Sequence, residues 1–264
     1  MGEVIVITSG KGGVGKTTTT ANIGTGLALE GKKVVVVDAD IGLRNLDVVM
    51  GLENRIVYDI VDVVEGVCRL RQALIKDKRY DGLFLLPAAQ TKDKNALKPE
   101  QMQNLCNELK EIFDFVLVDC PAGIEQGFKN AIAGANKALV ITTPEISAVR
   151  DADRIIGLLE AAELRNPQLV INRLRIDMVK KGDMMNIEDM IDILAIDLLG
   201  VVPDDEYIVI STNKGEPAVT DSNNMAGQAY RNITQRILGE DIPFLELEGQ
   251  ETFLSKIRKL FGMK

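Results

Sequence analysis

The chain alternates between short, uninterrupted apolar runs and longer stretches in which apolar residues recur every three or four positions. Uninterrupted runs rich in Val and Ile are typical of parallel strands that are buried on both faces. Such runs are found at Val4–Ile7, Val34–Val37, Leu83–Leu86, Phe115–Val118, Ala138–Ile141, Leu169–Ile171 and Gly200–Val202. Helical spacing is found between them, at Thr17–Glu30, Pro99–Ile112, Ser147–Leu164, Ile187–Ala195 and Ser222–Leu238. The pattern predicts an α/β fold with a doubly wound, mostly parallel sheet flanked by helices.

One domain accounts for most of the length. No segment rich in Pro, Gly or Ser interrupts the alternation, so residues 1–239 are expected to form a single domain. Residues 240–252 carry five acidic residues around a proline and a glycine, and we interpret them as an extended, solvated connector. Residues 253–264 carry four basic residues and no acidic one. A change of charge this sharp indicates an interaction segment.

Composition removes several classes of function. The formal net charge of −8 disfavours nucleic acid as a partner. Histidine is absent, so Ser-His-Asp catalysis and His-ligated metals are excluded. The cysteines Cys68, Cys106 and Cys120 are far apart in the sequence, which favours a reducing compartment over a disulfide framework. Without an apolar run of membrane-spanning length or a signal peptide, a cytoplasmic location is expected.

A glycine-rich motif separates the first predicted strand from the first predicted helix. Residues 10–17 fit the pattern G-x-x-x-x-G-K-[ST], and a strand before it and a helix after it are the context in which this pattern binds phosphate. Glycines let backbone N–H groups converge on phosphate oxygens, and the start of the helix adds partial positive charge. Lys16 is expected to reach the β- and γ-phosphates, and the Thr17 hydroxyl to bind Mg²⁺. The predicted nucleotide-binding residues here are Gly10, Lys11, Gly12, Gly13, Val14, Gly15, Lys16, Thr17 and Thr18.

Acidic residues follow two of the predicted strands. Asp38 and Asp40 come after Val34–Val37, and Asp119 comes after Phe115–Val118. The carboxyl ends of parallel strands are where open α/β sheets bind ligands, and a buried carboxylate needs a cation or hydrogen-bond donors. Asp119 is interpreted as the residue that holds Mg²⁺ through a water molecule, with Asp38 nearer the outer shell of the metal. A strand-end cap is the alternative role for Asp119.

The segment directly after Asp119 carries no acid at Cys120–Gly123, although many P-loop ATPases place a glutamate there to orient the attacking water. The water-positioning group must therefore come from elsewhere in the chain. Without a strong base at that place, basal turnover is expected to be slow, which suits a switch better than a metabolic enzyme.

The basic terminal segment has the pattern of an amphipathic helix. At 100° per residue, the apolar side chains from Phe253 to Phe261 fall within an arc of about 120°, and the basic residues flank and oppose this arc. This layout is typical of a helix that lies in anionic lipid headgroups; docking on its own domain and binding to a partner protein are the alternatives. One short helix binds weakly, whereas two copies on a dimer bind with avidity. The predicted membrane-binding residues are Phe253, Leu254, Lys256, Ile257, Arg258, Lys259, Leu260 and Phe261.

The phosphate loop contains a second lysine, Lys11, and its sequence Lys-Gly-Gly-x-Gly-Lys-Thr resembles the deviant Walker A motif of the MinD/ParA class of ATPases. The resemblance implies that ATP binds between two subunits and that Lys11 reaches the nucleotide of the partner subunit. It also implies that Asp40 orients the attacking water, which makes Lys11, Lys16 and Asp40 the expected catalytic residues. The residues implied at the adenine are Asn172, Pro203 and Asp204. Ordinary turn residues at the ends of strands are the alternative for these three.

Two further stretches, Asp38–Asp47 and Phe253–Gly262, are similar to the division-site-selection members of this class and narrow the resemblance. The stretch Asp119–Glu125 also matches, but it is shared across the wider class, as the phosphate loop is. Membership implies an ATP-dependent homodimer that associates peripherally with the anionic surface of the inner membrane. It implies recruitment of a septum-inhibitor protein, and release after hydrolysis that an activating topological-specificity protein stimulates. The loop after Asp40, including Arg44 and Asn45, would face these partners.

Four other functions stay open at this point. A flagellar-number regulator of the same class also carries a terminal amphipathic helix. A plasmid- or chromosome-partition ATPase would need a basic surface for DNA, whereas the chain outside 253–264 is acidic. An iron–sulfur carrier needs paired cysteines, and Cys120 has no matching second site in the sequence. A biosynthetic amidoligase would leave the basic terminal helix unexplained.

Overall fold

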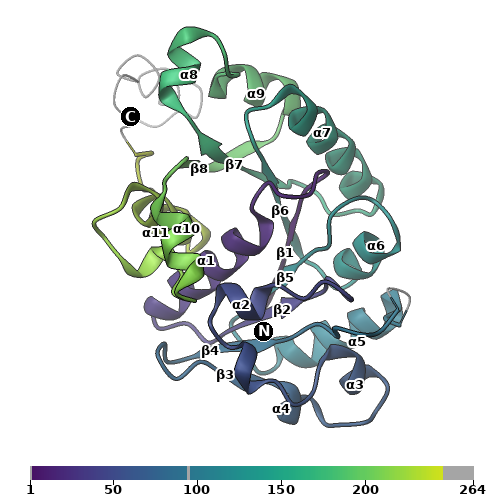
Figure 1. Cartoon of the computed structure of the whole chain (residues 1–264). Helices are drawn as coiled ribbons and strands as arrows, with labels where there is room; N and C mark the ends of the chain where they lie inside the picture. The colour runs from purple at the N-terminus through teal and green to yellow at the C-terminus, as the bar shows by residue number, and fades with distance from the viewer. Residues whose placement is uncertain (1, 94–95, 246–264) are drawn as a thin grey trace.

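The computed structural model describes residues 2–93 and 96–245, and these form one sheet of eight strands with helices around it (Figure 1). The strands are β1 (Glu3–Thr8), β2 (Val34–Asp38), β3 (Ile75–Lys76), β4 (Leu83–Leu86), β5 (Phe115–Asp119), β6 (Lys137–Thr142), β7 (Gln168–Leu174) and β8 (Asp197–Pro203). They lie in the order β3-β4-β2-β5-β1-β6-β7-β8, and every neighbouring pair is parallel except β3 and β4. Because β1 lies between β5 and β6, the loop that follows it opens at the middle of the sheet.

Helices cover both faces of this sheet (Figure 1). One face carries α1 (Lys16–Leu29), α2 (Leu46–Val49), α10 (Tyr207–Asn213), the 3-10 turn η2 (Ala218–Thr220) and α11 (Met225–Ile237). The opposite face carries α3 (Ile60–Val64), α4 (Leu70–Ala73), α5 (Pro99–Lys110), α6 (Gln126–Ile132), α7 (Ile146–Ala161), α8 (Ile176–Lys181) and α9 (Ile187–Leu194). The short turn η1 (Glu53–Arg55) follows α2. The result is the three-layer arrangement typical of α/β proteins.

The continuous apolar runs are explained by the alternation of side chains across the sheet. In β1, Val4 and Val6 pack into the core on one face, and Ile5 and Ile7 pack into the core on the other. Because both faces are covered, a polar residue at either set of positions would be buried. The strands therefore read as uninterrupted apolar runs rather than as an alternation of apolar and polar residues.

The strands and helices predicted from the sequence are confirmed, with ends that differ by a few residues. The sequence pattern does not predict β3 or the short helices, because a period cannot be recognised in so few residues. Within residues 2–93 and 96–245, no helix is both long and apolar enough to cross a membrane.

The end of the described chain lies against the body of the protein. After α11, the Phe244 ring stacks on the Arg236 guanidinium at 4.0 Å, and Arg236 Nε donates a hydrogen bond to the Ile242 carbonyl. Arg236 Nη1 also donates to the Leu199 carbonyl of β8. The first part of the predicted connector is thus held to the domain, while the domain boundary itself stays a prediction. The predicted membrane-binding segment, 253–264, lies outside the described residues.

Candidate nucleotide site

The loop between β1 and α1 is shaped by glycines. Gly13 and Gly15 adopt left-handed backbone conformations, with φ of 78° and 99°. Gly15 caps the N-terminus of α1, and a Cβ at this position would lie 2.3 Å from the side-chain nitrogen of Asn172. In the described part of the chain, nothing lies within 4 Å of a Cβ built at Gly13, so space is open beside the loop. An open glycine loop at the start of a helix is suited to phosphate groups.

Replacement of Gly15 by Ala is expected to lower the free energy of unfolding by about 1–3 kcal/mol, because the new Cβ combines an unfavourable φ with a clash against Asn172. Urea unfolding followed by circular dichroism measures the loss. Gly31→Ala is the matched control, since Gly31 has a φ of 75° and open space around it. A loss for Gly15→Ala no larger than that for Gly31→Ala would show that Asn172 does not limit the loop.

Lys16 begins α1, and its ammonium group is held inside the loop. The residue is only 7% exposed, and Nζ donates a hydrogen bond of 3.0 Å to the Ser9 hydroxyl. Ser9 in turn donates to the Lys11 carbonyl at 2.8 Å. The structure therefore holds a buried positive charge where the sequence predicts the phosphates. The role of Ser9 in holding this group is one that the motif does not indicate.

Two buried carboxylates lie beside the loop on neighbouring strands. Asp38 ends β2 and Asp119 ends β5, and the two residues are partners in the register of these strands. Burial, and then the charge of Asp38, raise the pKa of the Asp119 carboxyl, which hydrogen bonds from Thr17 and Thr20 and the charge of Lys16 lower only in part. Burial also raises the pKa of the Asp38 carboxyl. The pair lacks positive charge that a bound cation would supply.

The donor set around this pair fits Mg²⁺. In nucleotide sites this ion is held by one or two carboxylates together with hydroxyl and phosphate oxygens. The Thr17 hydroxyl is close enough to lower the pKa of the Asp119 carboxyl, so these two of the predicted ligands lie together. Among the described residues there is no cluster of three or more acidic or cysteine side chains that could hold a metal without further ligands from the phosphates of a nucleotide. These residues therefore suit a metal that shares its ligands with a nucleotide.

The Asp38 carboxylate also anchors the loop that follows it. Its Oδ1 accepts the Asp40 N–H at 2.9 Å, and its Oδ2 accepts the N–H groups of Asn45 and Leu46 at 3.2 and 3.1 Å. Both oxygens are thus engaged with backbone donors between β2 and α2. This geometry is in keeping with an outer-shell position for Asp38, and it makes Asp38 the residue that sets the path of the loop.

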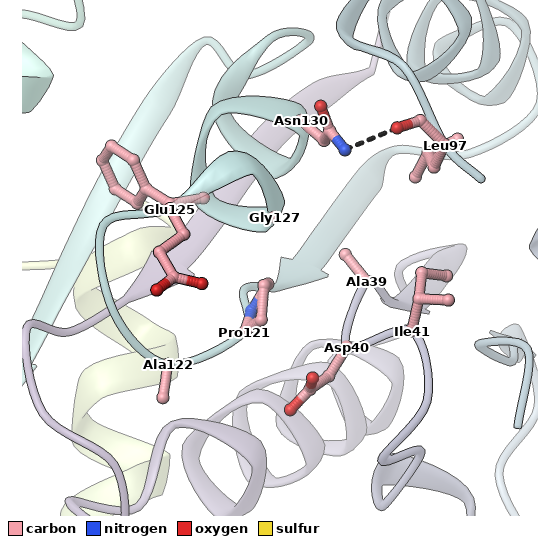
Figure 2. Close-up of a pocket in the computed structure, with 10 residues that line it drawn as sticks. Ala39, Asp40, Ile41, Leu97, Pro121, Ala122, Glu125, Gly127 and Asn130 are labelled. Atoms are coloured by element: carbon pink, nitrogen blue, oxygen red, sulfur yellow. Dashed lines mark hydrogen bonds between the residues drawn. The ribbon is translucent and has the colours of Figure 1, made fainter. Parts of the chain in front are cut away.

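Asp40 lines a small pocket between two loops (Figure 2). One wall is formed by residues 39–41, and the other by the loop after β5 and the first part of α6. Glu125 enters the same pocket from the second wall, so two carboxylates line it. Asn130 also lines the pocket, and its side-chain amide donates to the Leu97 carbonyl at 2.6 Å. Asp40 therefore lies beside the end of β5, where the sequence predicts the residue that orients the attacking water. Glu125 is a second candidate for this role, and the sequence motif does not single it out.

Lys11 contacts a segment far away in the sequence. Its Nζ forms an ion pair of 3.0 Å with the Glu145 carboxylate and donates to the Ser147 hydroxyl at 3.2 Å. Glu145 is the residue before α7 and lies three residues after the end of β6. The glycine motif gives no sign of this partner; the signal that could have found Glu145 is its place after the carboxyl end of a parallel strand.

The residues predicted at the adenine lie at the ends of β7 and β8, which are neighbours in the sheet. Asn172 Nδ2 donates to the Val14 carbonyl at 2.8 Å, so Asn172 supports the phosphate loop directly. The Asp204 N–H donates to the Leu174 carbonyl at 3.0 Å, and Pro203 is the register partner of Leu174. The structure thus brings the predicted residues to one end of the sheet, while their contact with a base stays a prediction.

A parallel sheet with a glycine loop at its centre and carboxylates beside that loop defines a P-loop nucleotide-binding protein. Comparison with known proteins agrees with this class. The chain matches the family model described as the CobQ/CobB/MinD/ParA nucleotide binding domain over residues 5–218.

Individual relatives narrow the assignment. The chain is 62% identical over 267 residues to the septum site-determining protein MinD of Bacillus subtilis, and the match covers all of both chains. It resembles a chain of the MinC:MinD cell division protein complex of Aquifex aeolicus, with 51% identity, a TM-score of 0.86 and coverage of 92% of this chain and 98% of that one. It also resembles the septum site-determining protein MinD complexed with Mg-ADP from Pyrococcus horikoshii OT3, with 30% identity, a TM-score of 0.83 and coverage of 92% and 100%. The chain therefore belongs to the CobQ/CobB/MinD/ParA nucleotide-binding family, in its branch of septum site-determining MinD proteins, which confirms the fold class and the family predicted from its sequence.

Proposed function

We propose that this chain is a switch that binds a membrane as an ATP-bound dimer, leaves it after hydrolysis, and so positions the division site. The observation that carries the proposal is the buried Asp38–Asp119 pair beside the buried Lys16, because this arrangement suits a triphosphate with a divalent cation. Similarity to septum site-determining proteins supports a role in division. The proposed location is the cytoplasmic face of the inner membrane.

The nucleotide is proposed to bind together with Mg²⁺, as supported by the Pyrococcus horikoshii relative in complex with Mg-ADP. When bound, Mg²⁺ supplies neutralisation of charge on the phosphate oxygens. Lys16 binds the β- and γ-phosphates, Thr17 and Asp119 face the metal, and Asp40 orients the attacking water. An aspartate is a weak base, so slow basal turnover is expected until an activating partner completes the site.

The Lys11 side chain is proposed to leave Glu145 of its own chain and to contact the nucleotide of the partner subunit when two protomers meet around ATP. Its ion pair with Glu145 is solvent-exposed, with 41% of the Lys11 side chain and 58% of the Glu145 side chain accessible. Exposed pairs of this kind contribute only about 0–1 kcal/mol. Exchange of Glu145 for a phosphate of the partner subunit therefore costs little, which supports a role for Lys11 in trans.

The proposed partners are a septum inhibitor and an activating protein of the same division system. The MinC:MinD complex of Aquifex aeolicus supports the first of these. The loop after Asp40 presents the exposed Leu43 and Asn45, whereas the Arg44 Nε is engaged with the buried Asp47 carboxylate at 2.9 Å. Leu43 and Asn45 are thus better placed than Arg44 to contact a partner.

The experiment that tests the proposal is co-sedimentation of the full chain with anionic vesicles in the presence of ATP or ADP. We expect binding with ATP and little binding with ADP, because two terminal helices on one dimer bind with avidity on the order of a hundredfold or more. Equal sedimentation with the two nucleotides would refute the switch.

Deletion of residues 253–264 is expected to abolish vesicle binding and to leave ATP hydrolysis in solution unchanged. The apolar arc predicted for this segment is the part that enters the lipid, and the nucleotide site lies elsewhere in the chain. Sedimentation and phosphate release measure the two effects.

Two point variants sharpen this test. Phe261→Asp places a charge in the predicted apolar arc and is expected to remove vesicle binding, whereas Ser255→Gln changes the opposite side of the helix and is expected to keep it. Vesicle binding that survives both the deletion and Phe261→Asp would place the membrane contact outside the terminal segment.

A further inference from the structure

The turn between β3 and β4 carries an arginine that joins three separate segments of the chain. The Asp77 carboxylate is buried, and it accepts hydrogen bonds from Arg79 Nε at 3.0 Å and from Arg79 Nη2 at 2.7 Å. The Arg79 N–H donates to the same carboxylate at 2.9 Å. The guanidinium is thereby fixed in one orientation, with 34% of the side chain exposed.

The other edge of this guanidinium faces the ends of two helices. Arg79 Nη1 donates to the Gly215 carbonyl at 2.8 Å, and Arg79 Nη2 donates to the Met50 carbonyl. Met50 follows α2 and Gly215 follows α10. The two chain segments touch there, because a Cβ at Gly215 would lie 2.5 Å from the Cα of Gly51. Arg79 therefore holds the C-terminal ends of α2 and α10 together.

The opposite end of α2 belongs to the nucleotide site. The N–H groups of Asn45 and Leu46, at the start of this helix, donate to the Asp38 carboxylate. From Leu46 to Met50 is one turn of helix, or about 6 Å. A displacement of the Met50 carbonyl would therefore reach the donors of Asp38 with little loss, since one turn of helix is stiff along its axis.

The helix α10 belongs to the other side of the same site. It follows the predicted adenine-side loop at the end of β8, and the Asp205 carboxylate accepts the N–H of Tyr207 at 2.9 Å and the N–H of Ala226 at 3.1 Å. The starts of α10 and α11 are thus tied together at this loop. Arg79 joins the C-terminal ends of α2 and α10, while the N-terminal ends of these helices lie at the phosphate side and at the base side of the site. We call this arrangement of Arg79, α2 and α10 the bracket.

We propose that Arg79 is a positioning residue for the nucleotide site, acting through α2 to keep the Asn45 and Leu46 amides aimed at Asp38. The guanidinium is suited to this because it donates in several directions within one plane, whereas a lysine ammonium at the same place lacks the fixed fork. The proposal rests on the proposed nucleotide-binding function, and it assigns a task to the antiparallel edge hairpin of the sheet.

The test compares Arg79→Met with Arg55→Met. Arg55 is the matched control, because its side chain is exposed and donates to the same hairpin, at the Lys76 carbonyl, with a distance of 3.4 Å. Hydrogen exchange of the segment 41–50 is measured in nucleotide-free protein. We expect it to become about tenfold faster in Arg79→Met and to stay unchanged in Arg55→Met.

Binding of a fluorescent ADP is then measured with Mg²⁺ and with EDTA. The gain in affinity that Mg²⁺ provides is expected to fall about fivefold or more in Arg79→Met, because Asp38 no longer keeps its place beside Asp119. A residue that only stabilises the fold would lower the melting temperature and leave this gain unchanged. If Arg79→Met does not fold, Arg79→Lys keeps the positive charge beside Asp77 and carries the same test.

The outcomes separate this proposal from the proposed function. Unchanged exchange of segment 41–50 together with an unchanged Mg²⁺ effect overturns the role of Arg79. Recovery of both properties in Arg79→Lys overturns it as well, because charge alone would then be sufficient. Failure of the wild-type chain to bind nucleotide would refute the proposed function, whereas the exchange result would still report on the bracket.

Discussion

Replacement of Lys16 by Ala is expected to abolish nucleotide binding and, with it, any nucleotide-dependent dimer. The Lys16 ammonium is buried within the loop, and its charge is one of those that lower the pKa of the Asp119 carboxyl. Its removal leaves Asp119 without this cation and the phosphates without their main positive partner. In binding, truncating one partner of a buried, hydrogen-bonded charge pair such as a lysine and a phosphate costs about 2–5 kcal/mol, which corresponds to a loss in affinity of about 30-fold or more.

Titration with a fluorescent ADP and light scattering with ATP measure the two consequences of Lys16→Ala. Lys180→Ala is the matched control, because Lys180 is an exposed lysine of α8, outside the residues that form the nucleotide site. Its binding and scattering are expected to match the wild type. A Lys16→Ala protein that still forms the ATP-dependent dimer would remove the phosphate-loop assignment.

Replacement of Asp40 by Ala is expected to keep ATP binding and to slow hydrolysis by about 100-fold or more, the usual contribution of a group that positions or activates the attacking water. Asp40 lines the pocket beside the end of β5, while the groups assigned to phosphate and metal, Lys16 and Asp119, stay in place. The variant should therefore accumulate in the ATP-bound state. Single-turnover phosphate release, with nucleotide binding measured separately, tests both parts of this expectation.

The pocket supplies its own control for this experiment. Glu125 lines the same pocket from the opposite wall (Figure 2), so Glu125→Gln removes a carboxylate from the same space. If Asp40 positions the water, Glu125→Gln should hydrolyse ATP at nearly the normal basal rate. Loss of hydrolysis in Glu125→Gln with normal hydrolysis in Asp40→Ala would transfer the role to Glu125.

Most of the sheet was accessible from the sequence because burial on both faces leaves a strong signal. The central positions of a strand such as β1, Val4 to Ile7, must be apolar, and such runs are easy to recognise. The edge strand β3 is different, since it has only two residues, one of them an exposed lysine. Its position depends on antiparallel pairing with β4 and on the turn that contains Asp77 and Arg79, which no periodicity reports.

The site divides in a similar way. The glycine motif fixes Lys16 and Thr17 locally, and the ends of two buried strands indicate Asp38 and Asp119. The partners of these residues depend on chain segments that meet only in the folded protein. Glu145 lies 134 residues from Lys11 along the chain, so sequence reasoning finds the charged groups of the site more readily than the contacts that hold them.

Under the proposed membrane binding, the stacking of Phe244 on Arg236 would limit the distance between the domain and the lipid surface. Because Phe244 is held against the domain, seven residues, 246–252, would separate the described chain from a membrane-binding segment that starts at residue 253. Seven residues span about 25 Å at most when fully extended. The domain of a membrane-bound protein would then stay close to the bilayer, and its partner proteins would have to bind it there.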